Sequence, residues 1–313
     1  MKKVVSLSSI LFLAVTASAA SVTVGSWVPI FKGIDHATGL EITADSRRLA
    51  VNAIRIDLTD PDVQMFSDPP CTNCPTGFET HGYTTGRFLK TYGVQVAVNA
   101  FGRLDVVVNN AGYGDIAPFE QMSSVRFRAV VDTNFYGVVH VTRAALPIMR
   151  QQRSGTILQI SSVGGRLALP GSAAYHAAKW AVGGFTEALA QEVAPFGVKV
   201  CALEPGGMRT NWGTRANQDT PALLPEYEPS VGAVAKALQP LWGQETSDPA
   251  KVAQVILRLA ASDRLPAHLL LGSDAVQFAG QAEVARAAEA DRWRELSVST
   301  DVNAPGSVPP LQF

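Results

Sequence analysis

The 313-residue sequence has only three cysteines, which are too few for a disulfide-stapled scaffold. An excess of charge is also lacking, because 26 basic side chains almost balance 27 acidic ones and no run of lysine or arginine stands out. Nucleic acid is therefore not expected as a partner. After the first twenty residues, no stretch approaches the roughly 20 apolar residues that a membrane-spanning helix needs. The hydrophobic content of 47% is that of a globular protein with a sizeable core.

The first twenty residues, MKKVVSLSSILFLAVTASAA, place two lysines before an apolar stretch and end on small residues that include Ala17-Ser18-Ala19. This order is typical of a secretory signal peptide. We therefore expect residues 1–20 to be a cleaved leader and the protein to be exported with no membrane span. A buried strand or the start of a helix is the alternative.

Two of the cysteines, Cys71 and Cys74, have the two-residue spacing of a zinc half-site or a redox pair. No second Cys/His pair at a matching spacing completes a metal site, so no metal is expected. Turn residues crowd the segment PPCTNCP, which favours a surface loop that an exported protein could close with a disulfide. Cys201 lies inside the apolar run VKVCAL and is expected to be a buried strand residue.

The chain changes character near residue 100. Residues 21–100 have strand-like runs at 49–58 and 94–99 and few helical signals. From residue 101, short apolar runs at 104–108, 156–160, 198–203 and 268–271 alternate with helical stretches at about 125–131, 135–150, 173–193 and 249–261. One more amphipathic stretch, 275–296, precedes a Pro/Ser/Gly-rich tail at 297–313, which we expect to be flexible. This alternation predicts an α/β fold, a Rossmann-like doubly wound parallel sheet.

Three residues within ISSVGGRLALPGSAAYHAAKWA form the sharpest chemical pattern. Tyr175 and Lys179 are four residues apart, so on a helix they share one face. A cation some 4 Å from a phenol is worth up to ~4 kcal/mol, or roughly three pK units, and would poise the tyrosine as a general acid or base. Ser162 follows the expected strand 156–160, where the active sites of parallel sheets lie. Alone, the Y-x-x-x-K spacing is weak, because Tyr175 could cap a helix while Lys179 is solvated.

Five motifs in register strengthen this pattern. They are FGRLDVVVNNAG at 101–112, DTNFYG at 132–137, ISS at 160–162, YHAAK at 175–179 and EPGGMRT at 204–210. Their order and spacing closely resemble the short-chain dehydrogenase/reductase family, and the resemblance covers about 101–290. It implies hydride transfer between NAD or NADP and a small-molecule alcohol or ketone. It also implies a homo-oligomer, whose subunits meet through the long helices that begin near 135 and 173.

The resemblance assigns roles to individual positions. Tyr175 would exchange a proton with the substrate oxygen, Lys179 would lower the pKa of Tyr175 and hold the nicotinamide ribose, and Ser162 would orient the substrate. Asn134 would complete a proton relay at a break in its helix. The remaining cofactor-binding positions line the cleft or face the nicotinamide: Asn109, Ala111, Gly112, Pro205, Gly206 and Thr210. Taken alone, Asn134 could simply begin a helix, Asn109 could be a turn residue, and Pro205-Gly206 could be an ordinary loop.

One family feature is missing. Members of this family begin with a strand and a glycine-rich turn, G-x-x-x-G-x-G, whose backbone approaches the cofactor pyrophosphate at a helix N-terminus. None of the 26 glycines fits that spacing or G-x-G-x-x-G. We therefore expect the N-terminal strands of the fold to be missing or replaced and NAD or NADP to bind weakly or not at all. The strand at 104–108 would become an exposed edge unless the run 94–99 covers it.

The segment before it resembles a different family. RLAVNAIRIDLTDPDVQMF and TTGRFLKTYGVQVAVNA are similar to the opening part of the phosphodiester glycosidases, over about 27–100. The expected organisation is thus a chimera, with a signal peptide at 1–20, a glycosidase-like segment at 21–100, a dehydrogenase-like domain at 101–296 and a tail at 297–313. The leader indicates export, whereas the dehydrogenase part indicates the cytoplasm.

Three functions follow from this organisation. The first is a dehydrogenase with intact catalytic residues and doubtful cofactor binding. The second is a secreted glycosidase-like or carbohydrate-binding fragment, and the third is an inactive α/β module that acts through protein contacts. The substrate is expected to meet the loop-rich segment 211–244, where Trp212, Tyr227 and Trp242 form an apolar lid or pack an ordinary pair of helices.

Overall fold

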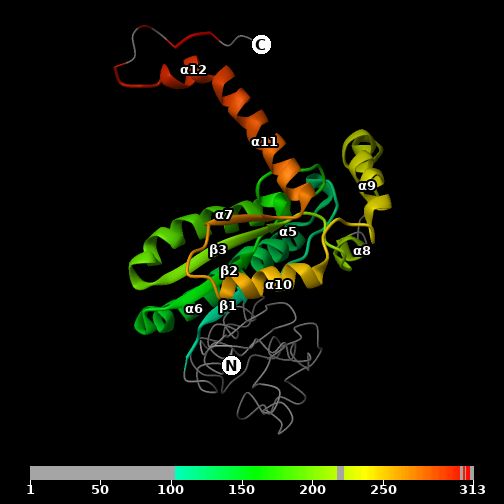
Figure 1. The fold of residues 1–313 in the computed structure, drawn as a ribbon. Coiled ribbons are helices and arrows are strands. Elements are labelled where there is room, and N and C mark those ends of the chain that lie inside the picture. Colours follow the sequence, from blue (N-terminus) through cyan, green and yellow to red (C-terminus); the bar gives the residue numbers. More distant parts are fainter. Residues whose placement is uncertain (1–102, 217–221, 304–305, 307, 311–313) are drawn as a thin grey trace, which may run out of the picture.

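The computed structural model describes residues 103–216, 222–303, 306 and 308–310. Within them the chain forms a four-stranded parallel sheet with flanking helices (Figure 1). The strands, in spatial order, are β1 (Val106–Asn109), β2 (Gly155–Ile160), β3 (Val198–Pro205) and β4 (His268–Leu271). Each coincides with one of the four apolar runs. The expected parallel sheet and Rossmann-like α/β class are therefore confirmed.

Helices occupy the segments between the strands. The α-helices are α5 (Ser124–Val131), α6 (Gly137–Gln152), α7 (Ala173–Val193), α8 (Trp212–Ala216), α9 (Ala233–Leu238), α10 (Pro249–Ala260), α11 (Ser273–Arg292) and α12 (Arg294–Val298). Two π-helical turns, η3 (Asp132–Tyr136) and η7 (Glu228–Gly232), interrupt the α-helical geometry. Short 3-10 turns are η2 (Phe119–Gln121), η4 (Val163–Gly165), η5 (Ala194–Phe196), η6 (Pro225–Tyr227) and η8 (Gln239–Leu241).

Local sequence signals explain several of the boundaries. Ser123 caps α5 by accepting a hydrogen bond from the Arg126 amide. Asp248 caps α10 in the same way, and Pro249 occupies the first helical position, where its missing N–H costs nothing. Gly197 ends the turn after α7 with a φ of 72°, a left-handed conformation that glycine adopts without strain.

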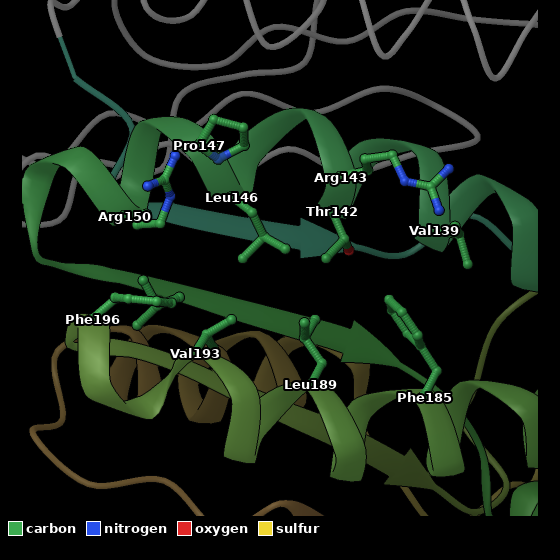
Figure 2. A pocket seen from close by; sticks show the side chains of 11 residues that line it. Val139, Thr142, Arg143, Leu146, Pro147, Arg150, Phe185, Leu189, Val193 and Phe196 are labelled. Atoms are coloured by element: carbon green, nitrogen blue, oxygen red, sulfur yellow. The ribbon is translucent and has the colours of Figure 1, made fainter.

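One face of the sheet is covered by α6 and α7. Strand residues at alternate positions, such as Val107, Ile157 and Val200, are in register with one another and point to this face. Apolar side chains of the two helices, among them Leu146 and Leu189, point toward each other across a groove (Figure 2). The cavity in this groove has a volume of about 410 Å³.

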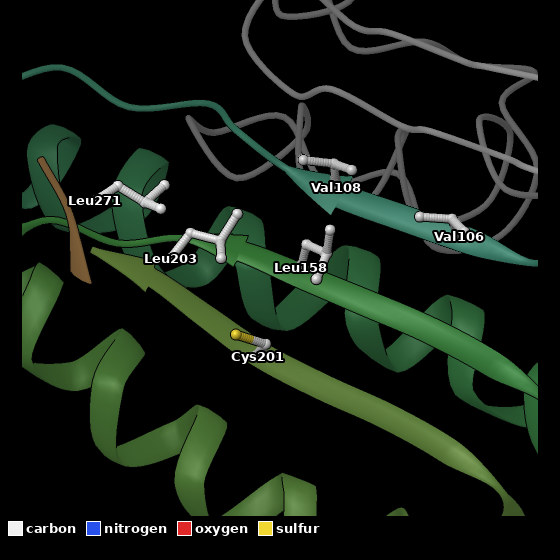
Figure 3. Packing of buried hydrophobic residues seen from close by; sticks show 6 residues of the cluster. All are labelled: Val106, Val108, Leu158, Cys201, Leu203 and Leu271. Atoms are coloured by element: carbon white, nitrogen blue, oxygen red, sulfur yellow. The ribbon is translucent and has the colours of Figure 1, made fainter. Parts of the chain in front are cut away.

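The opposite face packs against α10. Six buried side chains form its core, and Figure 3 shows how they line up along the sheet: Val106, Val108, Leu158, Cys201, Leu203 and Leu271. Apolar residues of α10, including Val252, Val255 and Ile256, pack on them. Cys201 is fully buried, as the sequence predicts, and burial raises the pKa of its thiol to about 12. Because both faces are covered, the strands are continuous apolar runs rather than alternating ones.

The remaining described elements lie at the carboxyl ends of the strands and beyond. Ile116, Ala216 and Val231 form a small second core. Helix α11 starts directly after β4 and projects from the sheet, with α12 at its far end (Figure 1). No helix among the described residues is long and apolar enough to cross a membrane.

Several expectations fall outside the described residues. They are the leader at 1–20, the glycosidase-like segment at 21–100 with its strand-like runs, and the Cys71/Cys74 loop. They stay predictions. Strand β1 is an edge strand of the described sheet, since it pairs only with β2 there, and its side chains are at most 2% exposed. The run 94–99 that was expected to cover its free edge lies outside the described residues, so that expectation stays a prediction.

Candidate functional site

Two neighbouring elements bring Ser162, Tyr175 and Lys179 together. Ser162 follows β2 and caps the turn η4, where its Oγ accepts a hydrogen bond of 3.0 Å from the Gly164 amide. Tyr175 and Lys179 lie one turn apart near the start of α7, and the Lys179 Nζ is 5.6 Å from the centre of the Tyr175 ring. A side-chain hydrogen bond joins Ser162 to the Tyr175 phenol. The structure thus brings the three side chains together at the carboxyl end of β2.

The electrostatics of Tyr175 differ from the expectation. Burial raises the pKa of Tyr175 above its usual value, and the hydrogen bond from Ser162 offsets only part of that rise. The expected lowering of this pKa by the Lys179 ammonium is therefore wrong for the described arrangement. Sharing a helix face is not sufficient, because the Lys179 Nζ binds the Ile160 carbonyl and lies 5.6 Å from the centre of the Tyr175 ring. At neutral pH, Tyr175 holds its proton and can donate it.

The Lys179 ammonium points toward the end of β2 instead. Its Nζ donates a hydrogen bond of 2.8 Å to the carbonyl of Ile160, and the residue is only 3% exposed. Burial lowers the pKa of Lys179 to about 8. An ammonium has three N–H donors, and the bond to Ile160 uses one of them.

Asn134 lies at the predicted break in the helix. The π-helical turn η3 separates α5 from α6, and the Asn134 amide nitrogen donates to the carbonyls of Tyr113, at 2.7 Å, and Val130, at 2.9 Å. Its Oδ1 is buried and has no hydrogen-bond partner among the described residues. Buried acceptors are usually paired, so this oxygen is available to a donor or a water.

The loop after β1 packs closely at Gly112. A Cβ added there would lie 2.7 Å from the Asn134 Oδ1 and 3.2 Å from the Lys179 Nζ, so only a glycine leaves room for both groups. Ala111 is buried beside it. Asn109 takes a different place, because its side-chain amide nitrogen donates to Thr142 of α6 and to Gln159 of β2. Asn109 can therefore contact a cofactor only through its backbone or through its buried Oδ1, which has no hydrogen-bond partner among the described residues.

The segment after β3 supplies the remaining predicted positions. Pro205 ends the strand, and the Gly206 amide donates to the carbonyl of Leu271. Asp274 of α11 approaches Gly206 so closely that a Cβ there would lie 2.3 Å from its Oδ2. Thr210 is exposed, and its hydroxyl accepts from the Trp212 amide. Within the described residues Thr210 forms no hydrogen bond with Tyr175 or Lys179.

The three aromatic residues expected to form a lid lie in two different places. The Trp212 ring lies 5.3 Å from the Tyr175 ring, centre to centre, and a Cβ on Gly114 would meet both rings. Trp242 packs against Gly213 and the second core instead. Tyr227 packs on the same core and donates its hydroxyl to Glu120. Only Trp212 is therefore placed to meet a substrate at Tyr175.

Three residues near the site were missed by sequence reasoning. They are Gly114, the Tyr175 neighbour His176, and Asp274, whose Oδ2 accepts from the Gly207 amide. Gly114 could have been noticed as a second glycine close after Gly112. The partners of His176 and Asp274 are backbone groups of distant loops, which leave no signal in the sequence. Among residues 103–216 and 222–303, no cluster of His, Cys, Asp and Glu could hold a metal ion.

Known proteins resemble the chain over the same region. The profile of the family described as short chain dehydrogenase matches residues 90–221. This match begins ahead of residue 101, where the sequence places the start of the dehydrogenase-like part, and the exact boundary stays a prediction.

Individual relatives extend this likeness. Oxidoreductase BOA17 of Botryotinia fuckeliana is 48% identical over 200 residues, which are 64% of this chain and 73% of the relative. The uncharacterized oxidoreductase C162.03 of Schizosaccharomyces pombe is 33% identical over 69% of this chain and 75% of its own length. The solved structure of a short-chain dehydrogenase from Streptomyces avermitilis has 32% identity and a TM-score of 0.64, and covers 80% of this chain and 82% of its own.

Proposed function

Because the chain belongs to the short-chain dehydrogenase family, we propose that it is an NAD- or NADP-dependent oxidoreductase that interconverts an alcohol and a ketone. The observation that carries this proposal is the grouping of Ser162, Tyr175 and Lys179 at the carboxyl end of β2. Open parallel sheets bind their ligands at that end. The names of the relatives support oxidoreductase chemistry and leave the substrate open.

Tyr175 is the proton-transferring group. With its pKa raised, its phenol is protonated at neutral pH, so it can give a proton to a ketone oxygen that becomes an alcohol. Ser162 interacts with the phenol in the free chain, and its single O–H can turn to the ketone oxygen when a substrate binds and fix the position of that oxygen. The protonated phenol is the form that ketone reduction uses, whereas oxidation of an alcohol uses the phenolate as a base.

Lys179 and Asn134 support this transfer. The Lys179 Nζ lies 5.6 Å from the centre of the Tyr175 ring, where it can hold the ribose of a bound cofactor beside the phenol. Asn134 presents its buried, unpartnered Oδ1 next to Gly112 and can hold a water that returns the proton. The ring of Trp212 packs against the Tyr175 ring and shields it from solvent.

The residues fit one half of a nicotinamide cofactor. Tyr175 and Lys179 provide a hydroxyl and a cation for the ribose hydroxyls, and Gly112 packs close beside the Lys179 Nζ. A nicotinamide bound there would supply or accept the hydride. The other positions proposed to contact the cofactor are Asn109, Ala111, Pro205, Gly206 and Thr210. For the pyrophosphate half, the sequence contains neither of the spacings G-x-x-x-G-x-G and G-x-G-x-x-G that build the usual glycine-rich cradle.

Titration of the full chain with NADH and NADPH tests this proposal. We expect nicotinamide fluorescence to change only far above micromolar cofactor, because the missing phosphate cradle leaves the ribose end to bind alone. At millimolar cofactor, ketone reduction should appear and should stop when Tyr175 is replaced. A dissociation constant in the micromolar range would contradict the weak binding. Absence of turnover with every ketone at saturating cofactor would contradict the function.

The groove between α6 and α7 also supports a role in binding another protein chain. Apolar side chains of Leu146, Phe185 and Leu189 line it, and no residue of the candidate site does (Figure 2). We propose that a second copy of the chain covers this face, as the resemblance implies for the long helices.

Light scattering of the purified chain should therefore give at least twice the mass of one copy. Leu146→Glu should reduce that mass to a single copy, because a carboxylate cannot be buried in an apolar contact without a partner. Val284→Glu, on an exposed part of α11, is the matched control and should leave the mass unchanged. A single-copy mass for the unmodified chain would contradict this proposal.

A further inference from the structure

The imidazole of His176 closes the loop that carries Ser162. This loop runs from the turn η4 to the start of α7, and His176 is the fourth residue of that helix. Its Nδ1 lies 2.8 Å from the carbonyl oxygen of Gly164, and its Nε2 lies 3.0 Å from the amide nitrogen of Leu169. One buried side chain thus bonds to the loop at two points, five residues apart.

The two partners fix the state of the ring. A carbonyl oxygen can only accept, so Nδ1 carries a hydrogen, and a backbone N–H can only donate, so Nε2 carries a lone pair. Both bonds can exist only in the neutral imidazole. Burial agrees with this, because it lowers the pKa of His176 below its usual value. The ring faces Tyr175 edge to face at 5.9 Å, and no charged side chain shifts its pKa.

Gly164 connects His176 to Ser162. The Gly164 carbonyl accepts from His176, while its amide donates to the Ser162 Oγ. The contact is close on both sides, since a Cβ on Gly164 would lie 3.0 Å from the His176 Nδ1 and 3.3 Å from the Ser162 Oγ. A shift of Gly164 would therefore move the Ser162 hydroxyl directly.

We infer that His176 is a positioning residue, which holds Gly164 and through it sets where the Ser162 hydroxyl lies against Tyr175. The inference rests on the proposed function for the role of Ser162 and Tyr175 in proton transfer. His176 itself does not touch the reacting atoms. It acts from the far side of the loop.

A titration of the Tyr175 phenol tests this without cofactor or turnover. The phenolate absorbance of each variant is compared with that of the same variant carrying Tyr175→Phe, so that the difference reports Tyr175 alone. Ser162→Ala should raise the pKa of Tyr175 further, because it removes the hydrogen bond that lowers it. His176→Phe should raise it in the same direction, and the double variant should show no more than Ser162→Ala alone.

Two further variants sharpen the test. His176→Asn keeps a donor near the position of Nδ1, so the bond to Gly164 can persist and the Tyr175 pKa should stay near that of the unmodified chain. It also serves if His176→Phe fails to fold. His140→Phe removes an imidazole from α6, away from the loop, and should change nothing.

The outcomes are distinct. If His176→Phe leaves the Tyr175 pKa unchanged while Ser162→Ala raises it, or if the two shifts add, the inference is overturned. In turnover, His176→Phe should lower the rate about tenfold, the order of one lost hydrogen bond, and should have no further effect in Ser162→Ala. If no ketone is turned over by any form, the proposed function fails, but the titration still decides the positioning role.

Discussion

Tyr175→Phe is expected to lower kcat/KM for ketone reduction by about a thousandfold, the middle of the range for losing a general acid. Phenylalanine keeps the ring that packs between Trp212 and Gly114 and removes only the hydroxyl. The substrate oxygen then loses its proton donor, and Ser162 loses its partner. Because the ring stays, KM should change much less than kcat. Initial rates at saturating cofactor measure both.

The matched control is Tyr136→Phe, which removes a phenol from an exposed position at the end of the π-helical turn η3. Its rate should equal that of the unmodified chain. If Tyr175→Phe also leaves turnover of every accepted ketone unchanged, the proton comes from another group. The three-residue site would then describe the ancestry of the chain rather than its chemistry.

The fold could be predicted in most of its described part because its strands are buried on both faces. Continuous apolar runs of four to six residues mark such strands, and all four were found at their places in the chain. The errors lie at the strand ends. Strand β1 extends to Asn109, one residue past the predicted run 104–108, because Asn109 pairs in register with Gln159 of β2.

The grouping of the site could also be predicted, whereas its electrostatics could not. A spacing of four residues places Tyr175 and Lys179 on one face of α7. It does not say where a flexible lysine side chain ends, and in the structure Nζ binds the Ile160 carbonyl. The pKa of Tyr175 is then governed by burial, which depends on packing that brings distant segments such as Trp212 and Gly114 over the ring.

The second large effect is that of Lys179→Met, which should stabilise the fold while it removes activity. Lys179→Met is expected to abolish turnover yet raise the free energy of unfolding at pH 7 by about 2 kcal/mol. Burial lowers the pKa of Lys179 to about 8 from 10.5, a difference equivalent to about 3 kcal/mol of unfavourable charge burial. Methionine removes that term, while the unpaired Ile160 carbonyl offsets about 1 kcal/mol of the gain.

The pH dependence follows from the same shift. Below pH 8 both the folded and the unfolded chain carry the Lys179 ammonium, so the folded state bears the full free-energy cost of burying that charge. Between about pH 8 and 10.5 the folded chain releases its proton first, so the unfolded state binds more protons and the stability of the unmodified chain rises with pH. The advantage of Lys179→Met should therefore shrink across this window. Urea unfolding at pH 7 and pH 10 measures the difference.

Lys236→Met provides the control, since Lys236 is mostly exposed and its only described ion pair is on the surface. Its stability should differ from that of the unmodified chain by less than about 1 kcal/mol at either pH. If Lys179→Met is less stable than the unmodified chain at pH 7, the buried ammonium is better compensated than its single bond to Ile160 implies. The site would then hold its cation without a stability cost, and the predicted conflict between stability and catalysis at Lys179 would be wrong.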